Sequence, residues 1–220
     1  MKGAGIVILI SGRGSNMQAI VEATRTGEIP AEVRAVVSSR PEAAGLKIAQ
    51  AANIPTQVVS HRDYLTREAL DEALTRAIDR HDPQLVVLAG FMRVVTANFV
   101  RRYQNQLMNI HPSLLPQFPG LRTHERALAA GVKHHGATVH FVTHEVDVGP
   151  IIVQATVPVL PNDTPDILAA RVLEQEHRIY PLAIKWFFEG RLSIRDGKVL
   201  LDGAVRPEQG IVEPPAAALV

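Results

Sequence analysis

An amide and an imidazole stand two residues apart at the end of an apolar run. If the run is a strand, Asn109 and His111 share one face, because alternate strand residues point to the same side. Pro112 ends that strand just past them. A second segment, 140–150, contains Asp147, a carboxylate able to fold back toward His111. Together the three side chains suit acyl transfer that forms no covalent enzyme intermediate.

A glycine-rich turn at 11–16 separates the first predicted strand from the first predicted helix. Helix N-termini present N–H groups and partial positive charge, so such a turn suits phosphate. The dinucleotide-binding pattern needs a third glycine where Met17 stands, and the Walker lysine is missing too. We therefore expect a monophosphate to bind at Gly14, Ser15 and Asn16. The alternative is a plain helix cap made by Ser15 or Asn16.

A third segment, 90–95, follows the fourth predicted strand, at the sheet edge where open α/β folds bind ligands. Its backbone groups and Met92 are suited to line a pocket for a flat heterocycle, with Arg93 meeting a carboxylate. The alternative is an ordinary strand-to-helix loop with a solvated Arg93.

The other histidines raise the question of a zinc site. His140 and His144 are four residues apart, and His134 and His135 lie nearby. Strand residues four apart do not reach one small ion unaided, and no carboxylate completes a recognised spacing. We expect no metal, and we expect His134 and His135 to belong to an exposed loop.

Nucleophilic catalysis also finds little support. A Ser–His–Asp hydrolase would use Ser113 or Ser15, but the chain has no G-x-S-x-G elbow. The chain has no cysteine, which excludes disulfides, thiolate metal sites and a cysteine nucleophile.

Short β-branched runs alternate with helical patterns in the first half. This alternation predicts βαβ units around a mostly parallel sheet covered on both faces, a Rossmann-like arrangement. The predicted strands are 6–10, 33–37, 56–59 and 85–89, and the predicted helices are 15–25, 42–52 and 67–81.

The second half has a different pattern. Runs at 140–143 and 151–157 flank Gly149 and Pro150 and predict antiparallel additions to the sheet. A long helix is expected over 165–188, bent or broken by Pro181. Asp196-Gly197 predicts a small terminal hairpin. The predicted fold class is α/β, a three-layer sandwich with a mostly parallel twisted sheet.

Composition fits an ordinary globular protein of 220 residues with a net charge of +1. Nothing in this charge balance points to nucleic acid or a membrane surface. The apolar run at 6–10 is too short for an export signal or a membrane span, so we expect the cytoplasm. We also expect one domain over 1–203 and a poorly ordered tail over 204–220, rich in proline and alanine.

These segments, taken in order, resemble the phosphoribosylglycinamide formyltransferases, the folate-dependent enzymes of purine synthesis. The resemblance runs from Ile6 to about Gly203. The segments that carry it are LISGRGSN, VVLAGFMR, NIHPSLLPQFPGLRTHERAL, HGATVHFVTHEVDVGPII and QEHRIYPL. It implies a formyltransferase fold and transfer of the formyl group of 10-formyltetrahydrofolate to glycinamide ribonucleotide. It implies small-molecule partners only, no metal, and a monomer or homodimer.

The resemblance also implies roles for single residues. Asn109, His111 and Asp147 match the catalytic trio. Glycinamide ribonucleotide would be held by Gly14, Ser15, Asn16 and Glu176. The folate-binding site would be lined by Arg67, Met92, Arg93, Val94, Val95, Asn109, Thr143, His144, Glu145, Val146 and Asp147. Four departures from the family pattern bear on binding details rather than on the chemistry: Arg13, His144, Val148 and Leu173.

In the implied reaction the substrate amine attacks the formyl carbon, and negative charge grows on the formyl oxygen. Asn109 donates a hydrogen bond to that oxygen, and a protonated His111 offsets its charge. Asp147 favours the protonated ring and accepts or relays the proton leaving the amine.

Two related folate enzymes and one non-enzyme are the rival interpretations. A methionyl-tRNA formyltransferase would carry a further basic RNA-binding domain, and a formyltetrahydrofolate hydrolase a regulatory domain before the catalytic one. We expect neither, because the chain is short and nearly neutral and its first strand begins near residue 5. A non-catalytic phosphate-binding module would bind ligand without turnover and tolerate loss of His111.

Overall fold

The structure is a computed structural model that describes residues 3–205 and 211–212. The chain forms two compact units. Unit 1 comprises Met1–Asn109 with Val142–His144, and unit 2 comprises Ile110–Phe141 with Glu145–Val220. The prediction of a single domain over 1–203 stays a prediction. Most of the tail, 204–220, lies outside the described residues.

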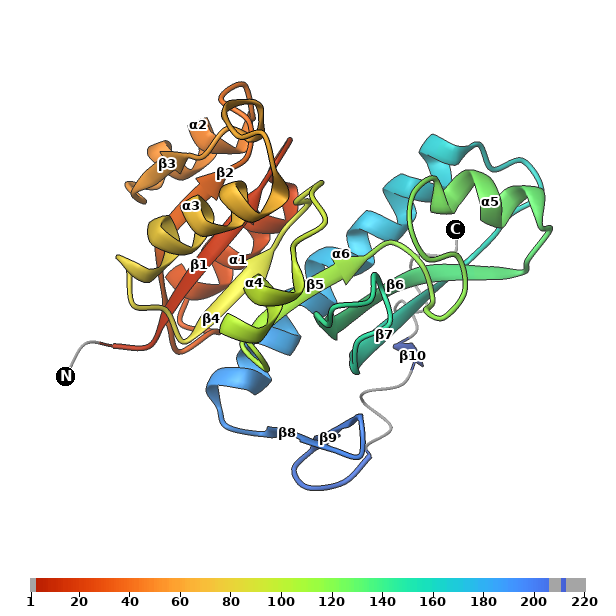
Figure 1. Cartoon of the computed structure of the whole chain (residues 1–220). Helices are drawn as coiled ribbons and strands as arrows, with labels where there is room; N and C mark the ends of the chain where they lie inside the picture. The colour runs from red at the N-terminus through yellow and green to blue at the C-terminus, as the bar shows by residue number, and fades with distance from the viewer. Residues whose placement is uncertain (1–2, 206–210, 213–220) are drawn as a thin grey trace. The chain divides into compact units, whose positions relative to one another are not determined.

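Unit 1 is built from alternating strands and helices (Figure 1). The strands are β1 (Gly5–Ile10), β2 (Glu32–Ser38), β3 (Thr56–Val58), β4 (Leu85–Leu88) and the first part of β5 (Leu107–His111). The helices are α1 (Ser15–Arg25), α2 (Gly45–Ala51), the 3₁₀ turn η1 (His61–Asp63), α3 (Arg67–Asp79) and α4 (Ala97–Arg102).

The strands of unit 1 pair in the order β5-β4-β1-β2-β3, and all four pairings are parallel. Parallel strands need crossover helices, which explains the near-continuous apolar runs buried on both faces. Strand β1 is buried over its whole length. The predicted Rossmann-like first half is therefore confirmed.

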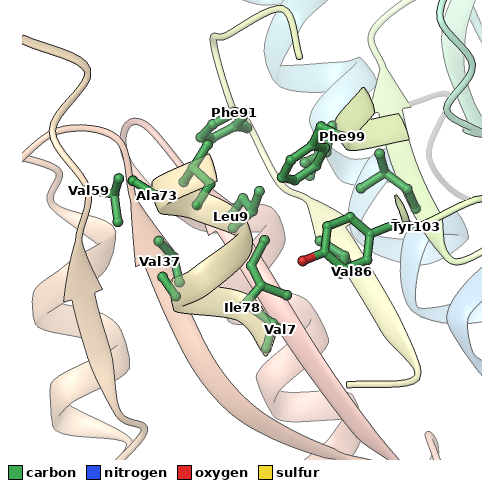
Figure 2. Packing of buried hydrophobic residues seen from close by; sticks show 14 of the residues in the cluster. Val7, Leu9, Val37, Val59, Ala73, Ile78, Val86, Phe91, Phe99 and Tyr103 are labelled. Carbon is green, nitrogen blue, oxygen red and sulfur yellow. The ribbon is translucent and has the colours of Figure 1, made fainter. Parts of the chain in front are cut away.

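One face of this sheet packs against α3 and α4. Alternate β1 residues, Val7 and Leu9, join a buried cluster with Leu74 and Ile78 of α3 and Phe99 of α4 (Figure 2). The apolar spacing of four along α3 places its buried residues on one side of the helix. The side chain of Thr66 caps α3 by accepting from the backbone N–H of Ala69 at 3.2 Å.

Unit 2 contains antiparallel strands and the longest helix. Its elements are α5 (Thr123–Ala129), β6 (His134–Phe141), β7 (Ile151–Pro158), α6 (Pro165–Phe188), β8 (Leu192–Arg195), β9 (Lys198–Leu201) and β10 (Ile211–Val212). Strands β6 and β7 pair antiparallel, and β10 adds to β7 in parallel. The antiparallel additions and the mixed α/β class are as predicted.

Two local predictions for unit 2 were wrong. Strand β6 begins at His134 rather than at His140, because residues from His134 onward pair with β7 as far as Pro158. His134 and His135 therefore lie in a strand and not in a loop. Pro181 lies inside an uninterrupted α6, so the break proposed there is wrong, and a bend at Pro181 stays a prediction. Packing of α6 against β6 and β7 is sufficient to keep the helix whole despite the lost hydrogen bond.

The terminal hairpin is confirmed. Strands β8 and β9 pair antiparallel around Asp196 and Gly197, whose φ angles are 51° and 72°. Positive φ at both central residues is the requirement of the tight hairpin turn that Asp-Gly favours. In the described part of the chain, no helix is both long and apolar enough to cross a membrane.

Candidate active site

His111 is the last residue of β5 and belongs to unit 2. Asn109, two residues earlier, is the last β5 residue of unit 1. Both lie on β5, the strand on which the shared face was predicted. His111 is 6% exposed, and Asn109 is half-buried. The chain turns after Pro112, where the Ser113 N–H donates to the His111 carbonyl at 2.9 Å.

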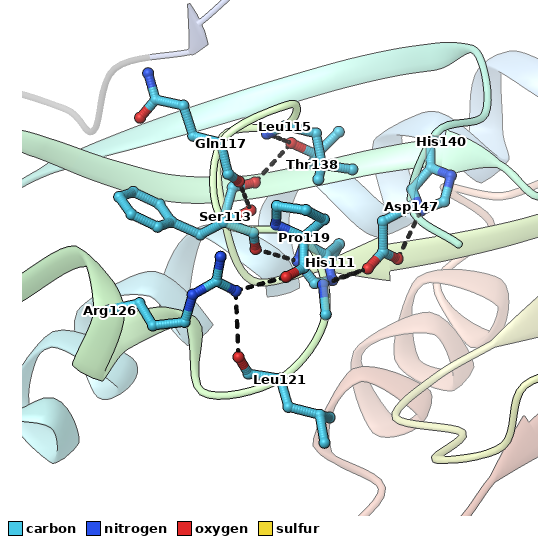
Figure 3. Close-up of polar contacts among 12 residues, drawn as sticks. His111, Ser113, Leu115, Gln117, Pro119, Leu121, Arg126, Thr138, His140 and Asp147 are labelled. Atoms are coloured by element: carbon cyan, nitrogen blue, oxygen red, sulfur yellow. Dashed lines mark hydrogen bonds and ion pairs between the residues drawn. The ribbon is translucent and has the colours of Figure 1, made fainter. Parts of the chain in front are cut away.

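Both ring nitrogens of His111 face oxygen acceptors (Figure 3). Nδ1 lies 3.4 Å from Oδ2 of Asp147, and Nε2 lies 3.0 Å from the Phe118 carbonyl oxygen. A neutral imidazole has one donor and one acceptor nitrogen, whereas the protonated ring has two donors. The surroundings of His111 therefore match the imidazolium form.

Asp147 is held in place by its own neighbours. Its Oδ2 accepts the Gly120 N–H at 2.8 Å, and its side chain is 9% exposed. Its φ of 59° lies in the left-handed region, which Asp tolerates better than most residues. The carboxylate predicted to fold back to His111 is thus at contact distance.

His140 lies on the other side of this carboxylate, with Nε2 3.9 Å from Oδ1 of Asp147. Burial lowers the pKa of His140, and its Nδ1 donates to the Phe141 carbonyl at 3.0 Å. A neutral ring protonated at Nδ1 has no proton on Nε2 to give to the carboxylate. His111 and the Gly120 N–H are the donors that Asp147 faces.

Two further histidines surround this group. Burial lowers the pKa of His135 to about 4, and proximity to His124 and His111 acts in the same direction. Burial and proximity to His111 also lower the pKa of His124. Their rings meet edge to face at a centroid distance of 5.2 Å. Neutral neighbours add no positive charge beside a protonated His111.

Thr138 fixes the loop that follows His111. Its hydroxyl donates to the Ser113 carbonyl at 2.7 Å and accepts the Leu115 N–H at 3.1 Å and the Gln154 amide at 2.8 Å. Ser113 is fully buried, and its hydroxyl donates to the Gln117 carbonyl at 2.6 Å. A hydroxyl used in this way is not directed to a base, which argues against a hydrolase with Ser113 as nucleophile.

The glycine-rich turn of unit 1 begins α1. Gly14 is the N-cap residue with φ 81°, and α1 has no side-chain cap hydrogen bond. The interpretation of Ser15 or Asn16 as a cap is therefore wrong. A Cβ on Gly14 would lie 2.7 Å from Cα of Gly45, the first residue of α2, so the turn and α2 touch through two glycines.

The segment after β4 presents exposed side chains. Met92 is 60% and Val94 53% exposed, Arg93 is exposed, and Val95 is half-buried. Nε of Arg93 donates to the Met92 carbonyl at 2.8 Å. The backbone N–H of Met92 donates to the Ser11 hydroxyl at 2.9 Å.

The remaining predicted site residues divide between the units. In unit 1, Arg67 is exposed at the start of α3, Thr143 is half-buried and His144 is exposed. In unit 2, Glu145 and Val146 are exposed just before Asp147, and Glu176 is 8% exposed on α6. Within the described residues, no group of three or more His, Cys, Asp or Glu is placed to hold a metal ion.

Comparison with known proteins places the chain in a family. The formyl transferase family matches residues 4–184. The chain belongs to the formyl transferase family. It is 51% identical over 205 residues to the phosphoribosylglycinamide formyltransferase of Escherichia coli, covering 93% of this chain and 97% of that protein.

Solved structures agree with this membership. The phosphoribosylglycinamide formyltransferase of Coxiella burnetii has a TM-score of 0.90 at 47% identity, over 97% of this chain and all of that one. The formyltetrahydrofolate deformylase of Pseudomonas syringae has a TM-score of 0.85 at 26% identity, over 91% of this chain and 66% of that one. The formyltransferase fold predicted from the sequence is confirmed.

Sequence reasoning missed several residues that shape the site. Phe118 supplies the carbonyl that faces His111, and the Ser11 hydroxyl accepts the Met92 N–H. Gly45 has no side chain and so allows the glycine turn to approach α2 closely. A glycine opening a helix was a visible signal for Gly45. A backbone carbonyl has no sequence signal.

Proposed function

We propose that this protein transfers the formyl group of 10-formyltetrahydrofolate to the amino group of glycinamide ribonucleotide, in purine synthesis. Family membership supports the reaction class, and the relatives named above supply the substrates. The observation that carries the proposal is the ion pair between His111 and Asp147, within a ring environment suited to the imidazolium.

The residues of unit 2 supply the charge for this reaction. The protonated His111 offsets the negative charge that grows on the formyl oxygen, once the substrate takes the place of the Phe118 carbonyl at Nε2. Asp147 maintains the charge of the ring and receives the proton that leaves the attacking amine, directly or through water. Glu176 binds the ribose hydroxyls of the ribonucleotide.

The residues of unit 1 bind and orient. Gly14, Ser15 and Asn16 hold the phosphate at the start of α1, where no side-chain cap competes for the N–H groups. The folate contacts Arg67, Met92, Arg93, Val94, Val95, Asn109, Thr143 and His144, together with Glu145 and Val146 of unit 2. Asn109 donates a hydrogen bond to the formyl oxygen. The enzyme would act in the cytoplasm, as a monomer or homodimer, with no metal and no nucleic-acid or membrane partner.

The test is an omission assay. The protein is mixed with 10-formyltetrahydrofolate and glycinamide ribonucleotide, and folate absorbance is followed with each substrate left out in turn. Release of tetrahydrofolate only when both substrates are present supports the proposal. Release without ribonucleotide would instead identify a hydrolase like the deformylase above, and no release in any mixture would indicate a binding module.

A further inference from the structure

Two buried serine hydroxyls meet where β1 and β2 end. The Oγ atoms of Ser11 and Ser39 are 2.7 Å apart, and the residues are 5% and 1% exposed. Ser11 is the first residue of the glycine-rich turn that leads into α1. A hydrogen bond between two buried hydroxyls is hard to replace with water once one partner is removed.

Ser39 is a fixed point in unit 1. Its N–H donates to the Ile10 carbonyl at 3.1 Å. Its carbonyl accepts both the backbone N–H of His61 at 3.2 Å and the ring Nδ1 of His61 at 2.9 Å. The Ser39 hydroxyl therefore projects toward Ser11 from a backbone that is bonded on both sides.

Ser11 joins the glycine turn to the segment after β4. Its N–H donates to the Gly90 carbonyl at 3.1 Å, which extends the β1–β4 ladder by one step. Its hydroxyl then accepts the Met92 N–H at 2.9 Å. Beyond the last backbone hydrogen bond between β1 and β4, the Ser11 side chain therefore connects the glycine-rich turn to the segment after β4.

The other end of the segment after β4 is held by a different hydrogen bond. Oδ2 of Asp71, a buried residue of α3, accepts the N–H of Thr96 at 2.6 Å. Three residues, 93–95, lie between these two bonded positions; Arg93 and Val94 are exposed, as is Met92 at the first bond. The segment is therefore held at both ends, with Arg93 and Val94 exposed and Val95 packed against the buried cluster between them.

We propose that Ser11 and Ser39 are positioning residues that hold the folate-lining segment 92–95 in register with the phosphate turn. The inference rests on the proposed function, which assigns folate and phosphate to these two segments. Because one hydroxyl serves both loops, ordering one loop favours the ordered form of the other. Binding of either substrate should therefore tighten binding of the other, by about fivefold.

The experiment measures each substrate's dissociation constant by calorimetry, alone and with the other site filled by a non-transferring folate analogue or by glycinamide ribonucleotide. The variants are Ser11→Ala, Ser39→Ala and Ser11→Thr. Ser38→Ala is the matched control, because Ser38 is fully buried and, among the described residues, its hydroxyl bonds to the backbone of Arg40, two residues on. Steady-state KM, kcat and Tm are recorded for all of them.

Ser11→Ala is expected to weaken folate binding about tenfold and to abolish the mutual tightening, with kcat within about threefold of wild type. Ser39→Ala should give a smaller loss, and Ser11→Thr should restore the coupling. Ser38→Ala should lower Tm with both dissociation constants unchanged.

Equal effects of Ser11→Ala and Ser38→Ala on binding would overturn the proposal. If the alanine variants at 11 and 39 do not fold, the test relies on the wild-type protein. If neither substrate tightens the binding of the other in the wild type, the proposal is also overturned. Failure of the proposed function is a separate result, because it appears as no formyl transfer by the wild type in the omission assay.

Discussion

At the scale of the residue, the surroundings of His111 define its chemistry. Asn109 and His111 could be singled out from the sequence because an amide and an imidazole two apart on a strand share a face. Asp147 could be proposed only as a residue able to fold back. Its left-handed backbone and the Gly120 N–H that fixes its carboxylate depend on a loop whose course no local pattern gives.

Replacing Asp147 by Asn removes the negative charge 3.4 Å from His111 Nδ1 while keeping the shape of the side chain. We expect kcat to fall by about 10²–10⁴-fold, because the ring loses the charge that favours its protonated form and the amine loses its proton acceptor. Ribonucleotide binding should stay within about twofold of wild type. Steady-state kinetics and calorimetry test this, and an unchanged kcat would refute the role of Asp147.

Asn109 offers a second test at the same scale. Asn109→Asp keeps the size of the side chain but replaces the donor amide with a carboxylate. We expect kcat to fall by about 10²–10³-fold, and Asn109→Ala to be no worse, since a carboxylate also repels the growing charge on the formyl oxygen. Single-turnover kinetics separate this loss from binding. An Asn109→Asp variant as active as wild type would exclude the donor role.

At the scale of the element, the alternation of β-branched runs and helical periods was sufficient to predict the parallel sheet of unit 1. The start of β6 was not predictable from local pattern, because Lys133-His134-His135-Gly136 has no strand character of its own. Pairing with β7 makes it a strand, and that contact lies about twenty residues away in the sequence. The same limit hid the approach of α2 to the glycine turn.

Gly45→Ala tests that approach. A Cβ there would lie 2.7 Å from Cδ1 of Ile10 and 3.1 Å from Cα of Gly14, so the Ile10 side chain must move and the Gly14 backbone must shift slightly away from α2. We expect the KM for glycinamide ribonucleotide to rise about tenfold with kcat little changed, because the N–H groups proposed to hold the phosphate belong to this turn and the proposed catalytic residues do not.

Gln50→Gly is the matched control for this variant. Gln50 is exposed on the same helix, and glycine there costs about 1 kcal/mol of helix stability without touching the turn. Its KM should stay near the wild-type value. Equal KM values for the two variants would mean that the effect comes from weakening α2 and not from crowding the turn.

At the scale of the whole molecule, buried histidines make the fold sensitive to acid. His135 is buried, and its side chain packs edge-on to Phe118 and His124. Its pKa of about 4 in the fold compares with 6.5 for an unperturbed histidine. Between these values the unfolded chain binds a proton that the folded chain does not.

Stability should therefore be at its full value above pH 6.5 and should fall as the pH drops toward 4, with His135 accounting for about 3 kcal/mol of the loss. His135→Leu keeps the site apolar and removes the titrating group, so its free energy of unfolding should fall less over the same range. Urea unfolding of both proteins from pH 7.5 to 4 measures the difference. Since His124 and His140 also have lowered pKa values, some acid sensitivity should persist in the variant. Parallel curves for the two proteins would show that His135 gains its proton equally well in the folded and unfolded chain.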